Sequence, residues 1–324
     1  MGNCVIRPER SVLRHNGYLN ADRPGRVEPN FTINRSMPMN SSKRSLNIAC
    51  LQTAPQPDFQ SALDEMIVLA EDAVEKGAEF ITTPEYCGGL KTAGSAFAPP
   101  AASEESHPVL NGLRTFAKNS KKFLLIGSIA VNGPENKVLN RSFVIDDDGN
   151  IISRYDKIHL FDVNLSERQS YCESASVYGG KNAVICPTPF GKMGQTICYD
   201  IRFPNLYRDL AQSGAEILFV PAAFTTKTGE AHWHVLNRAR AIENGAFVVS
   251  PCAVGKIAGG GASYGHSLII NPWGEVLADG GDQAGVINAV IDLDEVGIAR
   301  ERIPSLRHDR PFGITEGVET KDTQ

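Results

Sequence analysis

Short apolar runs and amphipathic segments alternate along the chain from Leu46 onward. The apolar runs are typical of buried strands, which we expect at residues 46–51, 78–82, 123–129, 143–145, 151–155, 192–198, 216–220, 246–250, 267–271, 275–277 and 286–291. Apolar residues recur at helical spacing in other segments, which predicts helices at residues 62–75, 109–119, 205–212 and 231–242. Turns at residues 146–149 and 272–274 indicate hairpins, whereas residues 192–220 read as a strand–helix–strand unit. The pattern therefore predicts an α/β fold with mixed sheets.

The two ends of the chain differ from its centre. Residues 1–45 are rich in Arg, Asn, Pro and Ser and show no apolar periodicity, which is typical of a poorly ordered extension. Residues 46–312 carry the strand and helix patterns without an internal linker. We therefore expect a poorly ordered N-terminal extension over 1–45, one folded domain over 46–312 and a C-terminal tail over 313–324.

Composition limits the classes of partner and compartment. The chain has 324 residues, 42% hydrophobic and 21% charged, as is usual for a globular protein. The formal net charge of -5 argues against nucleic acid as a partner. No apolar stretch approaches the ~20 residues of a membrane span, so no membrane partner is expected. Seven scattered cysteines without Cys-x-x-Cys spacing favour reduced thiols in the cytoplasm over a disulfide or zinc framework.

The segment 194–204, GQTICYDIRFP, carries the strongest chemical signal. A β-rich run ends there in Cys198 at an expected strand-to-helix junction, where N–H groups of the coming helix point at the thiol. Such a setting lowers the pKa of a thiol and can also stabilise an oxyanion. Taken alone, Cys198 is better explained as a small buried hydrophobe. The assignment of a nucleophile therefore depends on partners elsewhere in the chain.

Two other segments supply the partners that a nucleophilic cysteine needs. Glu85 directly follows the expected strand 78–82, and α/β folds place active sites at the carboxyl ends of strands. Lys157 lies in the partly apolar segment 154–160, where a held ammonium group could stabilise a thiolate and an oxyanion. Taken singly, Glu85 could open a helix, and Lys157 could be a surface lysine.

Together, Glu85, Lys157 and Cys198 predict thiol amidase chemistry. Glu85 would accept the thiol proton and later return a proton to the leaving ammonia, while Cys198 attacks the amide carbon. Lys157 and the Tyr199 N–H would hold the oxyanion. A thioester forms, and Glu85 then activates the hydrolytic water. This chemistry requires neither a metal ion nor an organic cofactor, and we expect none.

The chain over residues 46–312 resembles the nitrilase superfamily of carbon–nitrogen hydrolases. The resemblance rests on three strings in the family's order: Pro84-Glu85, YDKIHLF at 155–161 and GQTICYDIRFP at 194–204. It implies Glu85 as base, Lys157 as oxyanion stabiliser and Cys198 as nucleophile. It also implies that Glu173 orients Lys157 and the substrate, whereas the residues alone favour this role no more than that of a loop acid.

The same resemblance implies an architecture and an assembly. The family fold is a four-layer α-β-β-α sandwich with mixed sheets. Its members usually pair as homodimers, so we expect a homodimer or a higher homo-oligomer. The expected interface is formed by helices near 203–212 and 231–242 and by the segment 300–313.

Within the superfamily, the chain looks most similar to the amidases for deaminated glutathione. The strings CES at 172–174 and SYGHS at 263–267 favour this branch over the neighbouring omega-amidases, which act on alpha-ketoglutaramate. Glu230 stands where the branch pattern has proline, and the glycine loop 259–261 is unusual; both bear on substrate entry. The alternatives are an omega-amidase, an N-carbamoyl amide hydrolase, a nitrilase or, outside enzymes, an inactive scaffold.

We expect four residues to contact a small carboxylate-bearing amide: Tyr199, Arg202, Phe224 and Thr225. Arg202 comes just after the nucleophile and could clamp the substrate carboxylate through paired N–H donors. A salt bridge from Arg202 to Asp200 or Asp209 explains the same residue equally well.

Two further patterns have weaker chemical support. The segment 261–265 matches the Gly-x-Ser-x-Gly elbow of serine hydrolases, but a glycine loop precedes Ser263 and a β-rich run follows it. His232 and His234 resemble a metal-binding pair. At i, i+2 on a helix their side chains point to different faces, and no nearby cysteine or acid completes a site, so no metal site is expected.

Overall fold

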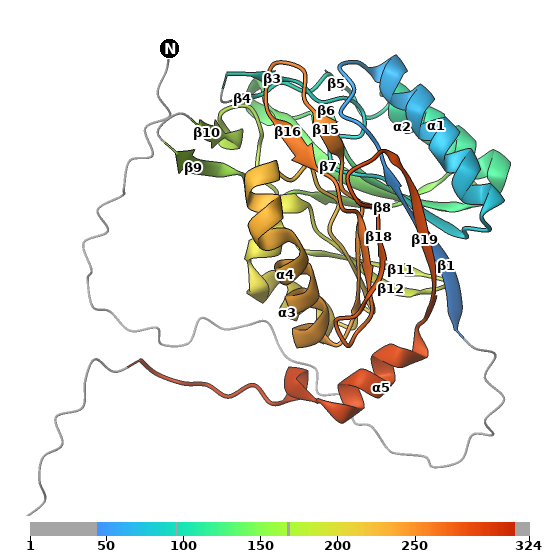
Figure 1. Ribbon diagram of the computed structural model, residues 1–324, viewed down its shortest axis with the longest axis vertical. Helices are drawn as coiled ribbons and strands as arrows, with labels where there is room; N and C mark the ends of the chain where they lie inside the picture. Colours follow the sequence, from blue (N-terminus) through green and yellow to red (C-terminus); the bar gives the residue numbers. More distant parts are fainter. Residues whose placement is uncertain (1–43, 95, 167–168, 315–324) are drawn as a thin grey trace, which may run out of the picture. The chain divides into compact units, whose positions relative to one another are not determined.

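The computed structural model describes residues 44–94, 96–166 and 169–314. The predicted extension over 1–45 lies outside these residues except for its last two positions, and the predicted tail over 313–324 lies outside them beyond residue 314. Both remain predictions. Within the described residues, strands and helices alternate along the chain as Figure 1 shows.

The first sheet is built from β1 Ser45–Gln52, β2 Phe80–Thr82, β5 Ala101–Ala102, β6 Phe123–Asn132, β7 Val138–Ile145, β8 Ile151–Asp156 and β19 Gly285–Asp292. Its order is β19-β1-β2-β6-β7-β8, with β5 paired to β6. Strands β1, β2 and β6 are parallel, whereas β6, β7 and β8 follow one another in antiparallel pairs. The carboxyl ends of β2 and β8 therefore lie at the same edge of the sheet.

The second sheet is built from β11 Val184–Thr188, β12 Gly191–Gln195, β13 Ile217–Phe219, β14 Phe247–Ser250, β17 Leu268–Ile270 and β18 Val276–Asp279, in that order. Strands β12, β13 and β14 are parallel, and the outer strands pair antiparallel. Three short hairpins lie outside the sheets: β3 Thr92–Ala93 with β4 Ala96–Phe97, β9 Asp162–Ser166 with β10 Gln169–Cys172, and β15 Val254–Lys256 with β16 Ala262–Tyr264.

Helices cover the outer face of each sheet (Figure 1). Helices α1 Phe59–Glu75 and α2 Pro108–Ser120 pack on the first sheet, and α3 Pro204–Gln212 and α4 Thr226–Asn244 pack on the second. Between the sheets, side chains from both inner faces form one core, in which the Phe80 and Phe219 rings stack 5.6 Å apart. This arrangement confirms the predicted four-layer α-β-β-α sandwich.

Burial on both faces explains why the central strands read as continuous apolar runs. In β1, Ile48 and Cys50 point into the core between the sheets, whereas Ala49 and Leu51 point toward α1 and α2. Alternate residues of a strand face opposite sides, so a strand covered on both sides needs apolar residues at each position. Continuous apolar runs of this kind are what predicted most of the central strands from the sequence.

Some element boundaries differ from the prediction. Helix α1 begins at Phe59, before the expected residue 62, because the Asp58 carboxylate accepts the Ser61 N–H at 2.9 Å and caps the helix. The expected strand 192–198 ends at Gln195, and a 3-10 turn, η3 Cys198–Arg202, precedes α3. Helix α5 Asp294–Arg302 was not expected, because it buries only Val296 and Ala299 and so lacks an apolar stripe.

The remaining short 3-10 turns are η1 Pro134–Asn136, η2 Glu173–Ala175 and η4 Ser305–Arg307. No described helix is both long enough and apolar enough to cross a membrane. Free thiols are present at Cys50, Cys87, Cys186, Cys198 and Cys252.

Candidate active site

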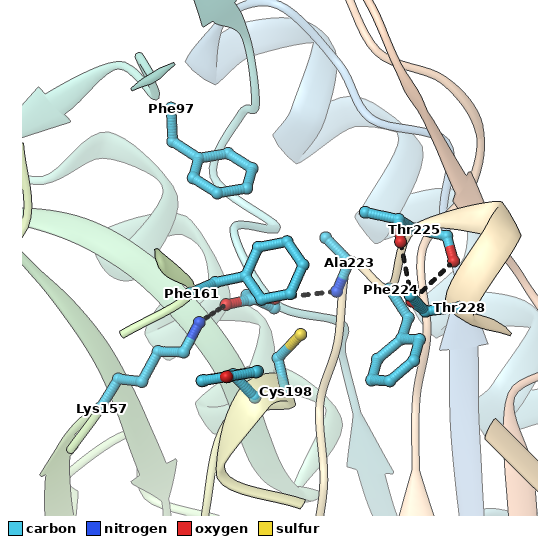
Figure 2. A pocket seen from close by; sticks show the side chains of 10 residues that line it. Phe97, Lys157, Phe161, Cys198, Ala223, Phe224, Thr225 and Thr228 are labelled. Atoms are coloured by element: carbon cyan, nitrogen blue, oxygen red, sulfur yellow. Dashed lines mark hydrogen bonds and ion pairs between the residues drawn. The ribbon is translucent and has the colours of Figure 1, made fainter. Parts of the chain in front are cut away.

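Three strand ends bring Glu85, Lys157 and Cys198 to one pocket. Glu85 lies in the turn after β2, and Lys157 directly follows β8, so both extend from the same edge of the first sheet. Cys198 opens η3 just after β12 of the second sheet. All three side chains line a single pocket, as the sequence predicts (Figure 2).

The charged centre of the site is an ion-pair network around Lys157. Its Nζ lies 2.8 Å from Glu85 Oε1 and 2.9 Å from Glu173 Oε2. The three side chains are almost fully buried, with exposed residue fractions of 2% for Lys157, 4% for Glu85 and 0% for Glu173. Buried charges are tolerated only when they are paired and hydrogen-bonded. The structure therefore brings Glu173 to Lys157, as the resemblance implies.

Neutral hydrogen-bond donors also contact the carboxylates of Glu85 and Glu173. Asn140 Nδ2 in β7 lies 2.9 Å from Glu85 Oε1 and 3.2 Å from Glu173 Oε1, so one amide group bridges both acids. The Tyr86 hydroxyl donates to Glu173 Oε1 at 3.1 Å, and the Phe161 N–H donates to Glu173 Oε2 at 2.6 Å. Sequence reasoning missed Asn140 and Tyr86. Asn140 gave no clear signal, because it stands in a polar run with Arg141 and Ser142, before the expected strand 143–145.

The second oxygen of Glu85 is held from the facing sheet. Glu85 Oε2 accepts the Ala223 N–H at 2.9 Å, and Ala223 lies beyond the end of β13. This contact joins the first sheet to the segment that also carries Phe224 and Thr225. Glu85 is thereby oriented from both halves of the sandwich, which supports its predicted position beside the thiol.

Cys198 has an unusual backbone conformation. Its φ of 48° lies in the left-handed region, which non-glycine residues seldom adopt and which often marks a functional residue. Its N–H donates to the Pro221 carbonyl at 2.9 Å, so this amide is not free to bind an oxyanion. The next N–H, of Tyr199, belongs to the first turn of η3, where N–H groups lack intrahelical acceptors. Figure 2 shows the Cys198 sulfur pointing into the pocket.

The thiol differs from the prediction in its acidity. Burial and the nearby Glu85 carboxylate raise the pKa of Cys198 well above its usual value, and Lys157 offsets this only in part. The expected lowering of this pKa is therefore wrong for the free enzyme. Burial alone would lower the pKa of Lys157, but Glu173 and Glu85 raise it well above its usual value. The resting site thus holds a neutral thiol beside a charged ammonium group, so a base must remove the thiol proton.

The structure rules out one of the two readings of Arg202, the salt bridge, and does not test the other. Asp200, the suggested salt-bridge partner, is fully buried and accepts the Tyr155 hydroxyl at 2.6 Å and the His159 ring at 2.7 Å. Among the described residues, Arg202 forms no carboxylate ion pair. Its guanidinium donates to His232 Nδ1 at 3.3 Å instead. The salt-bridge alternative is therefore wrong.

The remaining predicted substrate-binding residues line the pocket. Tyr199 lines the same pocket as Cys198. So do Phe224 and Thr225, together with Phe97, Phe161, Ala223 and Thr228 (Figure 2). Arg202 itself does not line the pocket; its guanidinium lies 5.4 Å from the Phe224 ring centroid and 5.9 Å from that of Tyr199, two residues that do. Ser263 lies in β16, with β17 rather than a helix after it, so it does not form a serine-hydrolase elbow.

Comparison with known proteins identifies the class. The chain matches the carbon-nitrogen hydrolase family over residues 47–301, so it belongs to this family. It is 39% identical over 268 residues to a deaminated glutathione amidase of Synechocystis sp., covering 80% of this chain and 96% of that relative. It is 33% identical over 263 residues to the omega-amidase NIT2 of Xenopus tropicalis, covering 81% and 94%.

The solved structures agree with the sequence matches. Saccharomyces cerevisiae Nit3, a member of branch 10 of the nitrilase superfamily, has a TM-score of 0.72 and 27% identity, covering 83% of this chain and 98% of that one. The protein is an amidase of the nitrilase superfamily, which hydrolyses carbon–nitrogen bonds other than peptide bonds. It falls in the branch that includes deaminated glutathione amidases and omega-amidases.

Proposed function

We propose that this amidase hydrolyses deaminated glutathione to a 2-oxo dicarboxylic acid and the amine cysteinylglycine through a thioester on Cys198. The observation that carries the proposal is the buried set of Glu85, Lys157 and Cys198 in one pocket. The substrate is supported by the 39% identical relative that is named for it. Deaminated glutathione also carries carboxylates, for which Arg202 supplies a cation beside the pocket.

Acylation starts from the neutral thiol. Glu85 accepts the thiol proton, and Cys198 Sγ forms a bond to the amide carbon. The carbonyl electron pair moves to oxygen, and the Lys157 ammonium and the Tyr199 N–H stabilise it. An ammonium group has three N–H donors. If one is shared between the two Glu173 oxygens and one goes to Glu85, the third is available to the oxyanion.

The second half of the reaction reverses the proton path. Glu85 gives its proton to the amide nitrogen, the carbon–nitrogen bond breaks, and the amine cysteinylglycine leaves the thioester. Glu85 then deprotonates a water molecule that attacks the thioester carbon. The carbon–sulfur bond breaks, the acid leaves, and Glu85 returns the proton to the thiol. Glu173 touches Lys157 rather than the reacting atoms, so we assign it a positioning role.

The Arg202 guanidinium is the proposed clamp for a substrate carboxylate. It has no carboxylate partner among the described residues, and it stands against the rings of Tyr199 and Phe224. A bidentate pair with a carboxylate is the geometry that guanidinium favours. Replacing Arg202 with Ala should raise KM for an acidic amide more than for a neutral amide. An equal rise for both amides would remove the clamp from the proposal.

A direct test compares cysteinylglycine release from deaminated glutathione with ammonia release from alpha-ketoglutaramate, measured side by side with Cys198→Ala as control. A higher kcat/KM for deaminated glutathione supports the proposal. A higher kcat/KM for alpha-ketoglutaramate would make the chain an omega-amidase, the second candidate, which the 33% identical relative favours. Carbon dioxide release alongside ammonia would indicate N-carbamoyl hydrolysis instead.

We also propose a cytoplasmic homodimer. Exposed apolar side chains on and near the predicted interface support the assembly: Val235 and Ile242 on α4, Ile298 on α5, and Ile303 just after it. Exposed apolar patches of this kind often mark protein interfaces. The domain boundaries 46–312 and the extension over 1–45 belong to the same proposal.

A further inference from the structure

A second group of chemically capable side chains lies on the outer side of the second sheet, away from the pocket. It consists of His234 on α4, His266 between β16 and β17, and Asp279 at the end of β18. The donor atoms of these three residues all lie within 4.8 Å of one another. None of the three lines the Cys198 pocket.

The fold brings together what the sequence pattern separates. His232 and His234 do diverge as expected, since His232 contacts Arg202 and His234 contacts Asp279. The expectation that no acid completes a site is wrong. Asp279 at the end of β18 is distant from His234 in the sequence, but the two side chains are in contact. His266 comes from a third segment. No local spacing rule could have shown this combination.

The distances are close to those of a metal site. Asp279 Oδ2 lies 2.9 Å from His234 Nε2, and Asp279 Oδ1 lies 2.8 Å from His266 Nδ1. Bonds of ~2.0–2.1 Å to a tetrahedral ion place ligand atoms roughly 3.3 Å apart. Spreading each His–Asp pair by roughly 0.5 Å would admit the ion. The ring protons of both imidazoles would then move to the opposite nitrogens, so that each presents a lone pair.

The ligands are held by their surroundings before any ion binds. His266 has a left-handed φ of 53°, its N–H donates to the Gly281 carbonyl at 2.7 Å, and its carbonyl accepts the Trp233 indole N–H at 2.7 Å. The Gly281 N–H also donates to Asp279 Oδ1 at 2.9 Å. The Tyr264 ring stacks on His266 with centroids 4.6 Å apart. Such preorganisation is what a metal site needs from its supporting residues.

We propose that His234, His266 and Asp279 bind one divalent transition-metal ion, with Zn²⁺ as the best match. Two imidazoles and a carboxylate form a ligand set that Zn²⁺ accepts, and an open position is usually filled by water. The side chains are about one-third exposed (35% for His234 and Asp279, 27% for His266), so water can reach the ion. The ion would join α4, the β16–β17 segment and β18. The inference does not depend on the substrate of the amidase.

The test is calorimetric titration of the full chain with Zn²⁺. Wild type should bind one ion in a saturable manner, and Cys198→Ala should bind it equally, which excludes the catalytic thiol. His234→Gln and Asp279→Asn should each weaken binding roughly tenfold or more. His308→Gln, the same substitution at an exposed histidine outside the cluster, should leave the affinity unchanged.

Thermal unfolding with and without Zn²⁺ is the second readout, because an ion that binds only the folded state raises Tm. Zn²⁺ should raise the Tm of wild type and of His308→Gln but not that of Asp279→Asn. The asparagine side chain has nearly the same shape as aspartate, so this variant should still fold. Absence of saturable binding to wild type would overturn the proposal and leave a hydrogen-bonded His–Asp–His cluster. Binding that survives both His234→Gln and Asp279→Asn would overturn it as well.

Discussion

At the scale of single residues, Glu85 has two opposite effects on Cys198. Its charge raises the pKa of the thiol in the resting site, and the same carboxylate is positioned to remove the thiol proton during the reaction. The nucleophile is therefore kept neutral until a substrate carbonyl is in place to share the developing charge. These two effects of Glu85 lead to a prediction that would not hold for an enzyme whose cysteine rests as a thiolate paired with an imidazole.

Glu85→Gln should lower the pKa of the Cys198 thiol, because it removes a neighbouring negative charge while Lys157 remains. Alkylation of the free enzyme by iodoacetamide at pH 8 should become faster, whereas kcat for amide hydrolysis should fall by ~10²–10⁴. Both rates are measured on the same preparation, with Cys198→Ala as the control for other thiols. Slower alkylation together with lost turnover would contradict the account of the raised pKa.

Lys157→Met should destabilise the protein by about 3–5 kcal/mol, because it leaves Glu85 and Glu173 buried without their cation. Urea unfolding of the variant and of wild type at pH 7 measures this loss. An unchanged free energy of unfolding at pH 7 would show that the network is not the buried ion pair described above.

At this scale the sequence was sufficient for the residues that follow strand ends. Glu85, Lys157 and Cys198 were predicted because each stands in a recognisable string beside an apolar run. Asn140 was not, because its role depends on which face of β7 points at two acids from other segments. The acidity of Cys198 was predicted in the wrong direction, because burial and the charge of Glu85 depend on tertiary packing.

At the scale of elements, β6 supports the catalytic turn through a residue without a side chain. A Cβ at Gly127 would lie 1.9 Å from the Thr83 carbonyl oxygen and 2.4 Å from that of Pro84. Real side chains do not approach backbone so closely, so an alanine would push the turn that carries Glu85. Gly127 thus links the packing of the first sheet to the position of the base.

Gly127→Ala should lower kcat at least tenfold by displacing Glu85, since small misplacements of catalytic groups cost rate steeply. Gly285→Ala in β19 is the matched control, because a Cβ there meets nothing within 4 Å. The rate of amide hydrolysis and Tm are measured for both variants. Wild-type kcat in Gly127→Ala would show that the turn tolerates the shift.

Helices and strands could be predicted from the sequence where burial imposes a regular spacing of apolar residues, and not elsewhere. The two-sided strands and α1, α2, α3 and α4 have clear apolar patterns. Helix α5 and the two-residue strands β3, β4 and β5 bury too little surface to leave one. The His234–His266–Asp279 cluster also could not be predicted from the sequence, because its residues come from three separate elements.

At the scale of the whole molecule, the layer order came from the family resemblance and not from the strand pattern. Periodicity alone indicates an α/β fold, and it does not say that two sheets stack face to face with helices outside. The shared core around Phe80 and Phe219 establishes the stacking. The exposed apolar residues of α4 raise the question of what covers them in solution.

Ile242→Glu should convert the proposed homodimer to a monomer, because it places a charge on an exposed apolar position of α4, where Ile242 is 53% exposed. Val68→Glu on α1, where Val68 is 64% exposed, is the matched control and should leave the assembly unchanged. Light scattering after size-exclusion chromatography gives both masses. A monomeric wild type would contradict the proposed assembly.

The central claim is that Cys198 carries the acyl group during turnover, and acid quenching followed by peptide mass spectrometry tests it most directly. With deaminated glutathione, the peptide that contains Cys198 should gain the mass of the substrate minus cysteinylglycine, and Cys198→Ala should show neither this adduct nor cysteinylglycine release. An acyl group on another residue, such as Ser263, would contradict the account. So would near-wild-type turnover by Cys198→Ala.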